Sequence, residues 1–384
     1  MGKLQRWAYV FAARIILTAV VFALLVAYIP VNDSRAAAIE RIFLFFGVFT
    51  IVSFFVHISL ALLQISIRKL HQSNDEHSEV YDLAHVMLNL DSTPPSTWNN
   101  MGYWPARDET TPACSFPDAN LALAVKLARA ANLGPDDCVL DIGIGCGDQS
   151  LVYAPMTRQY VGATSLADHA ALATGKLRNA GLLGKASVYT LDCSVPDETH
   201  WPAEMLRSFV VQGDVNKILA LDCLYHFTPS RARFLAFAHS SLEAACERLT
   251  KQVLSDSPRE VCFAAEDLLL SSRSSLSLPK LLGLRAICLL TQTPFANFLD
   301  EHEYLSLLHA AGFTPAQSWT VELQDITEHV FPGLAGFLAD RAAARDGVGR
   351  WLRFERFAVF GQVVRWWYTQ RVVRAYIISA RKSI

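Results

Sequence analysis

The chain has 384 residues, of which 52% are hydrophobic and 18% are charged, and its mean hydropathy is +0.24. This composition excludes disorder as the general state and suggests that part of the apolar surface faces lipid. The 34 basic and 36 acidic residues give a net charge of -2. Such a balance gives no general attraction to a phosphate backbone, so nucleic acid is not an expected partner.

Two long uncharged runs lie near the start of the chain. Residues 15–31 carry no charge over about 17 positions, which is near the lower limit for crossing a bilayer as a helix. Residues 42–67 are longer, and His57 is their only basic side chain. The first run lacks a small-residue cleavage site, which disfavours a signal peptide. The sequence therefore predicts that residues 1–71 form a transmembrane hairpin anchor.

The orientation of this anchor follows from the basic residues around it. Three lie before the first run and two directly after the second, against two in the connecting loop. The positive-inside rule then places both ends in the cytosol. We expect an integral membrane protein with a cytosolic domain, with the endoplasmic reticulum as the default membrane and a bacterial-type plasma membrane as the alternative.

The rest of the chain divides into a polar segment and a folded domain. Residues 72–117 are rich in polar residues and proline, which predicts a linker and an N-terminal cap segment. From residue 118 to 384, short apolar runs alternate with helical patterns, which predicts crossover units and a parallel sheet. The predicted strands are 138–144, 160–165, 186–191, 215–221, 261–270, 314–323 and 374–380.

An insertion interrupts this alternation after the fifth predicted strand. Residues 271–277 are rich in serine, and an apolar segment follows at 278–290. We expect a lid near 271–298, because insertions of this kind often cover a site. The eight cysteines are scattered without a C-x-x-C pair. This is typical of reduced thiols, so we expect no disulfide framework and no metal site.

A glycine-rich turn follows the first predicted strand. The run VLDIGIGCGDQ (139–149) leads from a buried strand into Gly143, Gly145 and Gly147. Glycines at alternate positions let a ligand lie against the backbone. The dinucleotide pattern needs a small residue where this chain has Asp148, and a Walker loop is absent, so phosphate binding is disfavoured. Together with Asp141 at the strand end, Asp148 favours a positively charged ligand.

This run resembles the first motif of the class I S-adenosylmethionine-dependent methyltransferases, and the resemblance extends over residues 98–384. Within that superfamily the chain looks like the branch of cyclopropane fatty acid synthases and tocopherol methyltransferases. The resemblance implies a Rossmann-like α/β fold with a seven-stranded, mostly parallel sheet whose last strand is antiparallel, here preceded by two transmembrane helices. It also implies S-adenosylmethionine as the cofactor.

The resemblance assigns cofactor contacts residue by residue. The glycine loop, with Asp148 and Gln149, would hold the methionine part, and Asp141 would face its ammonium group. The run YVGATSLADHAALA resembles a G-[VI]-T-x-S-x-x-Q pattern, although the acid that many relatives use for the ribose is missing. The remaining positions near the cofactor are Thr164, Ser165 and His169 in that run, Asp192 and Cys193 in TLDCSVP at the adenine, and Tyr103 and Trp104 in WNNMGYWP.

The run LALDCLYHFTPSRARFL follows the fourth predicted strand and places Asp222 beside the cofactor, with Tyr225 and His226 as candidate catalytic residues. Histidine has a suitable pKa for accepting the proton that an acceptor releases. The run resembles I-E-x-x-E-H-V of the lipid-modifying branch, whose histidine helps to hold a bicarbonate base. Tyr225 replaces the acid there, which disfavours cyclopropane chemistry and leaves O-, N- or C-methylation open. A buried core imidazole is the alternative for His226.

Two further features lie near the end of the chain. Asp325 and His329 are four residues apart, and the pattern is typical of solvated polar residues on a helix face. The stretch around Trp366, Trp367 and Tyr368 mixes aromatic and basic residues. It predicts a helix that either lies in the interface of a membrane or makes no membrane contact, and the family resemblance places the last strand after it.

The sequence thus predicts a membrane-anchored methyltransferase whose acceptor is a lipid or another apolar small molecule. Methylation of a membrane-associated protein or of a small aromatic compound is the rival enzymatic function. A non-catalytic scaffold with the same fold is the alternative from another class, because the usual L-R-P-G-G turn before the fifth strand is replaced by CERLTKQVLSDSPRE. The sequence leaves the oligomeric state open.

Overall fold

The computed structural model describes residues 88–90, 96–105, 114–194, 196, 201, 215–251, 259–343 and 355–384. Contacts within the chain separate Met1–His77 from Ser78–Ile384, and every described residue belongs to the second unit. The two apolar runs predicted to span a membrane, 15–31 and 42–67, therefore lie outside the described residues. Among the helices in the described ranges, none is both long enough and apolar enough to cross a membrane.

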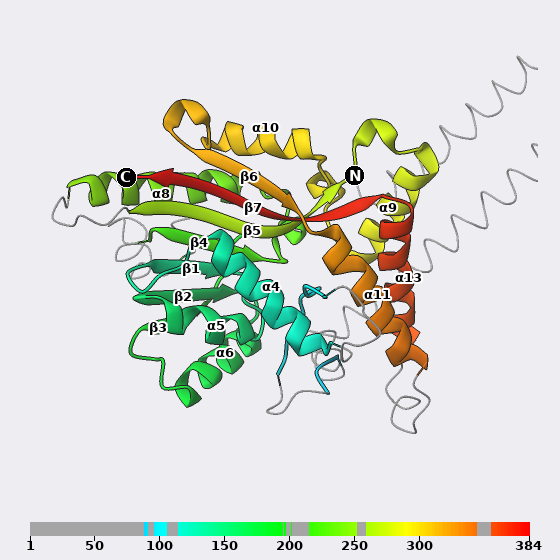
Figure 1. The fold of residues 1–384 in the computed structure, drawn as a ribbon, viewed down its shortest axis with the longest axis horizontal. Helices are drawn as coiled ribbons and strands as arrows, with labels where there is room; N and C mark the ends of the chain where they lie inside the picture. The colour runs from blue at the N-terminus through cyan, green and yellow to red at the C-terminus, as the bar shows by residue number, and fades with distance from the viewer. Residues whose placement is uncertain are drawn as a thin grey trace, which may run out of the picture. The chain divides into compact units, whose positions relative to one another are not determined.

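Seven strands form one sheet in the order β3-β2-β1-β4-β5-β7-β6 (Figure 1). Their bounds are β1 Cys138–Ile142, β2 Gln159–Thr164, β3 Ala186–Thr190, β4 Lys217–Leu221, β5 Glu260–Leu270, β6 Thr320–Asp325 and β7 Val373–Ser383. The pairs among β1 to β5 are parallel, whereas β7 runs antiparallel to both β5 and β6. The predicted mixed sheet with one antiparallel strand is therefore confirmed.

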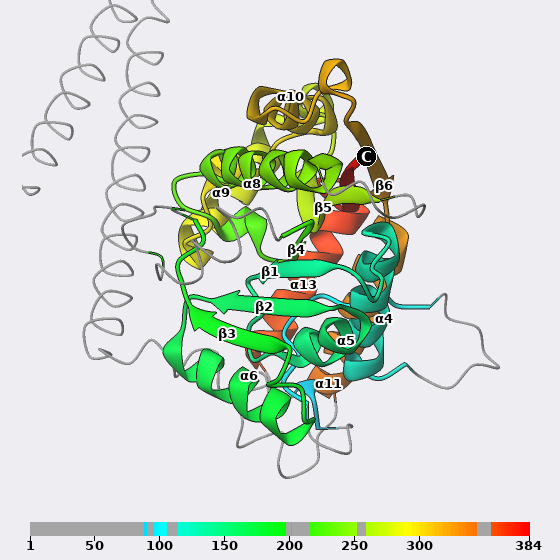
Figure 2. The same cartoon turned by 90° about the vertical axis from the view of Figure 1, so that its left-hand side faces the viewer.

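Helices cover both faces of this sheet. One face packs against α4 (Phe116–Ala130), α5 (Asp148–Met156) and α6 (Ala167–Asn179), and Figure 1 shows α4 on the near side. The other face packs against α8 (Ala232–Lys251), over which α10 (Glu301–Ala311) lies (Figure 2). Alternate residues of each central strand enter one core or the other. This explains why the strands read as continuous apolar runs in the sequence.

Local signals in the sequence fix where these helices begin and end. The side chain of Ser115 accepts a hydrogen bond from the backbone N–H of Asp118 at the start of α4. Asp300 and Glu303 form a reciprocal capping box at the start of α10, which Gly312 ends in a left-handed conformation. Such caps satisfy backbone groups that a helix leaves unpaired at its termini.

Three further helices stand together at one end of the sheet, on the right in Figure 1. They are α9 (Leu278–Thr291), α11 (Thr327–Ala343) and α13 (Glu355–Thr369). The chain passes from α13 directly into β7, so these helices stand where β7 begins. Since β7 runs antiparallel to β5, this is also the end at which β5 and the other parallel strands finish. The predicted insertion near 271–298 is therefore largely helical, and the predicted helix before the last strand is α13.

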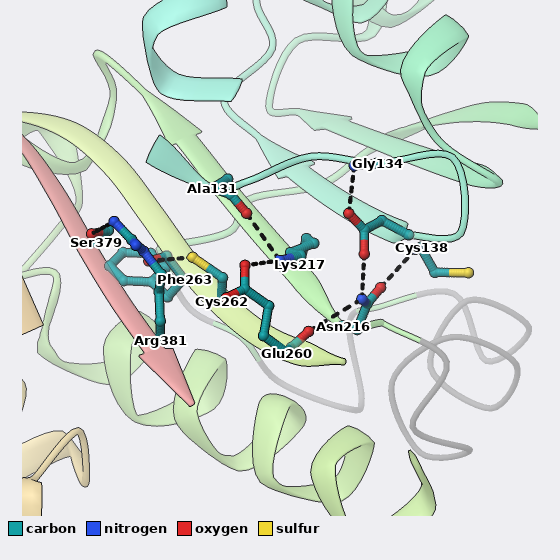
Figure 3. A network of polar contacts seen from close by, with 11 residues as sticks. Ala131, Gly134, Cys138, Asn216, Lys217, Glu260, Cys262, Phe263, Ser379 and Arg381 are labelled. Atoms are coloured by element: carbon teal, nitrogen blue, oxygen red, sulfur yellow. Dashed lines mark hydrogen bonds and ion pairs between the residues drawn. The ribbon is translucent and has the colours of Figure 1, made fainter. Parts of the chain in front are cut away.

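The opposite end of the sheet is held by a buried polar network (Figure 3). Lys217 at the start of β4 donates to the carbonyl oxygen of Ala131 at 2.9 Å and pairs with Glu260 at 2.7 Å. The side-chain oxygen of Asn216 accepts from the backbone N–H of Cys138 at 2.7 Å. These bonds join the starting ends of β1, β4 and β5, so the network has a structural role far from the glycine-rich turn.

Candidate active site at the ends of β1, β4 and β5

The glycine-rich turn begins directly after β1 and ends at the first residue of α5. Gly143 and Gly145 have φ angles of +67° and +52°, which residues with a Cβ adopt rarely. A Cβ atom at position 143 would lie 2.6 Å from the Cβ atom of Cys223, and one at position 145 would lie 3.1 Å from the Asn99 amide oxygen. Gly147 also has a positive φ angle. The turn thus presents bare backbone where β1 and β4 end.

Asp141 lies beneath this turn and is fully buried. One of its oxygens accepts a hydrogen bond from the Tyr160 hydroxyl at 2.6 Å, and the Gln149 amide donates to the carboxyl group at 2.9 Å. Burial raises the pKa of Asp141 to about 7, although both hydrogen bonds oppose this. No basic side chain pairs with it in the described part of the chain. A cationic ligand here would offset the cost of burying the carboxylate.

Asp148, the other acid of the turn, already forms an ion pair with a basic residue of the protein. Its carboxylate pairs with Lys176 at 2.5 Å and accepts from the Thr97 hydroxyl at 2.7 Å and the Thr97 backbone N–H at 3.1 Å. The structure therefore gives Asp148 a structural task, which is to attach the segment before the domain to the start of α5. The sequence analysis did not select Lys176 as a site residue.

The end of β2 brings two of the three residues predicted in this region inside the protein. Thr164 and His169 are buried, whereas Ser165 is exposed. The Thr164 carbonyl oxygen accepts from the backbone N–H of Leu191, which continues the pairing of β2 with β3 beyond Thr190. These residues lie at the same edge of the sheet as the glycine-rich turn, because β1 and β2 are parallel.

Asp192 and Cys193 follow β3 at this edge. Asp192 is exposed, and one of its oxygens accepts from the backbone N–H of Ser194 at 2.9 Å and from its hydroxyl at 2.6 Å. Cys193 is buried, and burial, together with the neighbouring carboxylates, raises the pKa of its thiol. Asp192 is thus free to accept one further donor, whereas the thiol of Cys193 is a packing group.

Tyr103 and Trp104 lie away from the glycine-rich turn. The Trp104 ring is buried against Phe337 of α11, and its indole N–H donates to the carbonyl oxygen of Met101 at 2.9 Å. The Tyr103 ring stacks on His329 at 4.6 Å between ring centroids. The structure therefore assigns Trp104 to the core between α4 and α11, because a large apolar ring gains more from burial there than at a polar turn.

Three residues just before this aromatic pair reach the strand ends instead. Asn99 faces Gly145, the Asn100 amide donates to the carbonyl oxygen of Leu221 at 3.3 Å, and the Met101 backbone N–H donates to Asp222 at 2.7 Å. The family resemblance selected this segment for the site but selected Tyr103 and Trp104 in it, not Asn99, Asn100 or Met101. The polar side chains of the two asparagines are the sequence signal that could have identified them.

Asp222 follows β4 in a left-handed conformation, with a φ angle of +55°. Its second carboxylate oxygen accepts from the Tyr225 hydroxyl at 2.8 Å. Burial raises the pKa of Asp222 to about 7 against these hydrogen bonds, and the nearby charge of Asp267 adds to the rise. Tyr225 is itself buried. Both residues therefore position the loop that carries His226.

His226 is an exposed residue, and neighbouring protein atoms desolvate part of its ring. This desolvation lowers its pKa to about 4, so the imidazole is neutral at physiological pH. Its Nδ1 atom lies 3.4 Å from the Thr293 hydroxyl, just beyond the end of α9. When Nδ1–H donates to Thr293, the lone pair of Nε2 can take a proton. The side chain is therefore not a core imidazole.

Glu266 is a further acid at this edge, and the sequence reasoning did not select it. It lies on β5 opposite Leu221, and its carbonyl oxygen accepts from the backbone N–H of Asp222. Its carboxyl group is fully buried, and neither oxygen has a hydrogen-bond partner among the residues that the structure describes. Burial, reinforced by the charges of Asp222 and Asp267, raises its pKa well above the usual value. The sequence feature that could have identified Glu266 is the presence of acidic residues inside the apolar run VCFAAEDLLL.

Asp325 and His329 take structural roles on the far side of α11. Asp325 pairs with Arg374 and accepts from the backbone N–H of Thr327 at 2.8 Å.

No cluster of histidine, cysteine or acidic residues within the described ranges has the arrangement of a metal site. The candidate site thus consists of the glycine-rich turn with Asp141, the Asp222 loop with His226, and Glu266.

No protein-family model and no curated protein sequence matches this chain. Solved structures do match it. The apo form of the mycolic acid cyclopropane synthase CmaA1 is 17% identical, with 78% of this chain and 100% of that chain covered and a TM-score of 0.56. A geranyl diphosphate methyltransferase in complex with GPP and sinefungin is 14% identical, with 79% and 96% covered and a TM-score of 0.53.

The [4+2]-cyclase SpnF is 18% identical to this chain, with 79% of this chain and 94% of that chain covered and a TM-score of 0.51. At such low identities, the likeness establishes the fold and leaves the reaction to be argued from the site. The described part of the chain therefore has the α/β methyltransferase fold, a seven-stranded mixed sheet with one antiparallel strand.

Proposed function

We propose that this protein is an S-adenosylmethionine-dependent methyltransferase whose acceptor is a lipid or another apolar small molecule. The observation that carries the proposal is Asp141. A fully buried carboxylate with only neutral partners lies beneath a glycine-rich turn, at the edge where open α/β sheets bind ligands. S-adenosylmethionine carries an ammonium and a sulfonium group, and both complement this negative charge.

The residues present fit this cofactor. Asp141 would balance its charge, and the turn of Gly143 and Gly145, whose Cβ positions are taken up by Cys223 and Asn99, would present backbone groups to it. Two similar structures support the assignment, because a second structure of the cyclopropane synthase CmaA1 holds SAH and CTAB and the geranyl diphosphate methyltransferase holds sinefungin and GPP. Bound here, the cofactor would supply an activated methyl group.

His226 is the residue best placed to accept a proton from the acceptor. Its imidazole is neutral, and Thr293 orients the ring through Nδ1, which leaves Nε2 for the acceptor. Asp222 holds the loop of His226 and the segment at Met101 together, so it aligns the two sides of the site. Alignment matters because the displacement of a methyl group requires an in-line approach.

An apolar acceptor is favoured by what surrounds His226. The apolar helix α9 ends two residues before Thr293, so the ring lies next to an apolar surface. The ligands of the two similar complexes, CTAB and geranyl diphosphate, also carry long apolar chains. We propose in addition that residues 15–31 and 42–67 anchor the protein in a membrane, by default that of the endoplasmic reticulum, with the domain in the cytosol.

Calorimetric titration of the purified full chain with S-adenosylmethionine and S-adenosylhomocysteine tests the proposal. We expect micromolar binding that Gly145→Arg abolishes, because the new side chain would collide with Asn99. Gly184→Arg is the matched control, since Gly184 is exposed and nothing lies within 4 Å of its Cβ position. Absence of binding in a folded sample would contradict the proposal and favour a scaffold.

A further inference from the structure

Helix α9 presents leucine side chains to solvent. Leu278, Leu282, Leu289 and Leu290 are 68%, 57%, 73% and 57% exposed, whereas only Leu284 and Cys288 of this helix are buried. Leu278, Leu282 and Leu289 are spaced by four and seven positions and therefore form one stripe along the helix, and Leu290 lies beside it. A surface helix of a soluble protein normally turns charged and polar residues outward. The pattern of α9 is the reverse.

Helix α13 extends this apolar surface. The two helices touch, because a Cβ atom at Gly283 would lie 3.2 Å from the ring of Trp366. Val359 and Phe360 of α13 are 65% and 38% exposed. A shallow apolar groove between the helices is lined by Ile287, Ala358, Val359, Gln362, Val363 and Trp366. An apolar surface that continues over two helices marks an interaction site more strongly than scattered exposed residues do.

Apart from Glu355 at the start of α13, the charged residues of α9 and α13 are all basic, and Glu328 of the neighbouring α11 contacts Tyr368 of α13. Residues 271–299 contain three basic residues and no acidic residue, and no acidic residue follows Glu355. Arg285 of α9 and Arg365 of α13 are both exposed. Exposed apolar side chains combined with basic groups are characteristic of helices that lie in the interface of an anionic bilayer.

We propose that α9 and α13 dock on the surface of an anionic lipid bilayer, with the leucine stripe of α9 in the headgroup layer. The docked helix would place Thr293, and with it His226, at the lipid surface. An acceptor dissolved in the bilayer could then reach the site without crossing water. The docking stands independently of the chemistry, whereas its use in acceptor delivery rests on the proposed function.

A fluorescent label on α9 tests the docking. The full chain with Leu289→Cys is labelled with an environment-sensitive dye and reconstituted into vesicles of phosphatidylcholine and phosphatidylserine. Six of the eight native cysteines are buried and the other two are half-buried, which favours labelling at the new site. The matched control carries the label through Leu172→Cys, because Leu172 is 48% exposed on α6. Some of the vesicles contain lipids with a nitroxide quencher.

We expect a blue-shifted emission at position 289 that the nitroxide lipids quench, and no quenching at position 172. Equal, water-like emission at both positions would overturn the proposal. A blue shift at position 289 without quenching would overturn it as well, because another part of the protein would then cover α9. Binding of S-adenosylhomocysteine to the same samples separates a failure of docking from a failure of the proposed function.

Discussion

The backbone N–H of Met101 donates to a carboxylate oxygen of Asp222 at 2.7 Å, although 121 positions separate the two residues in the chain. The other carboxylate oxygen accepts from the Tyr225 hydroxyl. One buried carboxyl group thus joins the segment before the domain to the loop that follows β4. The same link holds Asn99, which belongs to this segment, next to the glycine-rich turn.

Asp222→Ala removes the acceptor of both donors and should release the segment at Met101. A typical hydrogen bond contributes about 0.5 to 1.5 kcal/mol, so amide exchange in residues 96–105 should accelerate by about two- to tenfold. Hydrogen-exchange mass spectrometry measures this. Asp168→Ala is the control, since Asp168 is exposed in the first turn of α6. Unchanged exchange in Asp222→Ala would mean that other contacts hold the segment.

Asp141 should make cofactor affinity depend on pH. Its pKa is raised to about 7, so between about pH 4 and 7 the folded state holds a proton that the unfolded state has lost, and stability falls as the pH rises. A cationic ligand prefers the carboxylate. Binding of S-adenosylhomocysteine should therefore tighten by about three- to tenfold from about pH 6 to 7.

Calorimetric titrations at several pH values test this dependence. Asp222 has a pKa in the same range but is bound by Met101 and Tyr225, so the Asp141→Asn variant separates the two groups. This variant should bind more weakly and lose the slope. A slope that survives in Asp141→Asn would assign the dependence to Asp222 or to the ligand.

Gly143→Ala should destabilise the fold. The φ angle of +67° strains any residue with a Cβ, and the added atom would lie 2.6 Å from Cys223. Strain of this kind costs about 1 to 3 kcal/mol, which denaturant unfolding should resolve. Gly184→Ala, at an open position without a positive φ angle, should leave the free energy of unfolding nearly unchanged. Equal stability of the two variants would show that the turn relaxes freely.

The strands and the turn could be predicted because their signals are local. Apolar runs between helical patterns located all seven strands, and the glycine spacing located the turn between β1 and α5. Asp141 and His226 also lie where strand ends predict them. In each case the chain neighbours of the residue determine its position relative to the sheet.

Partners distant in the sequence could not be predicted in this way. Asp148 and Lys176 are 28 positions apart, and their pairing requires α5 and α6 to pack first. Trp104 illustrates the same limit, because its place in the core depends on Phe337 of α11. Glu266 escaped notice because two adjacent acids, Glu266 and Asp267, in an otherwise apolar strand carry no periodic pattern.

The contact between His226 and Thr293 should govern turnover more than binding. His226→Ala should keep S-adenosylhomocysteine binding and lower methyl transfer to a lipid extract by about 10² to 10⁴, which is the usual contribution of a general base. Thr293→Val keeps the ring but removes the hydroxyl near Nδ1, so we expect a smaller loss, about tenfold. Wild-type rates in His226→Ala would remove this residue from the mechanism.

Glu266 should lower the stability of the protein at neutral and higher pH. Its carboxyl group is buried without a hydrogen-bond partner in the described ranges, and its pKa is raised well above the usual value. The folded state thus keeps a proton that the unfolded state loses above about pH 4.5, and the free energy of unfolding falls as the pH rises. Glu266→Gln removes this titration, so its stability relative to the wild type should grow with pH in denaturant unfolding.

A stability difference between Glu266→Gln and the wild type that does not change with pH would contradict this account, because the carboxyl group would then not titrate differently in the folded and unfolded states. Glu266→Leu distinguishes packing from function. An apolar side chain of similar size removes the buried polar carboxyl group, whose burial without a hydrogen-bond partner costs about 1 to 3 kcal/mol, so Glu266→Leu should be neutral or stabilising. If Glu266→Leu gains stability but loses methyl transfer, the acid is retained for the acceptor, because packing alone would favour the leucine.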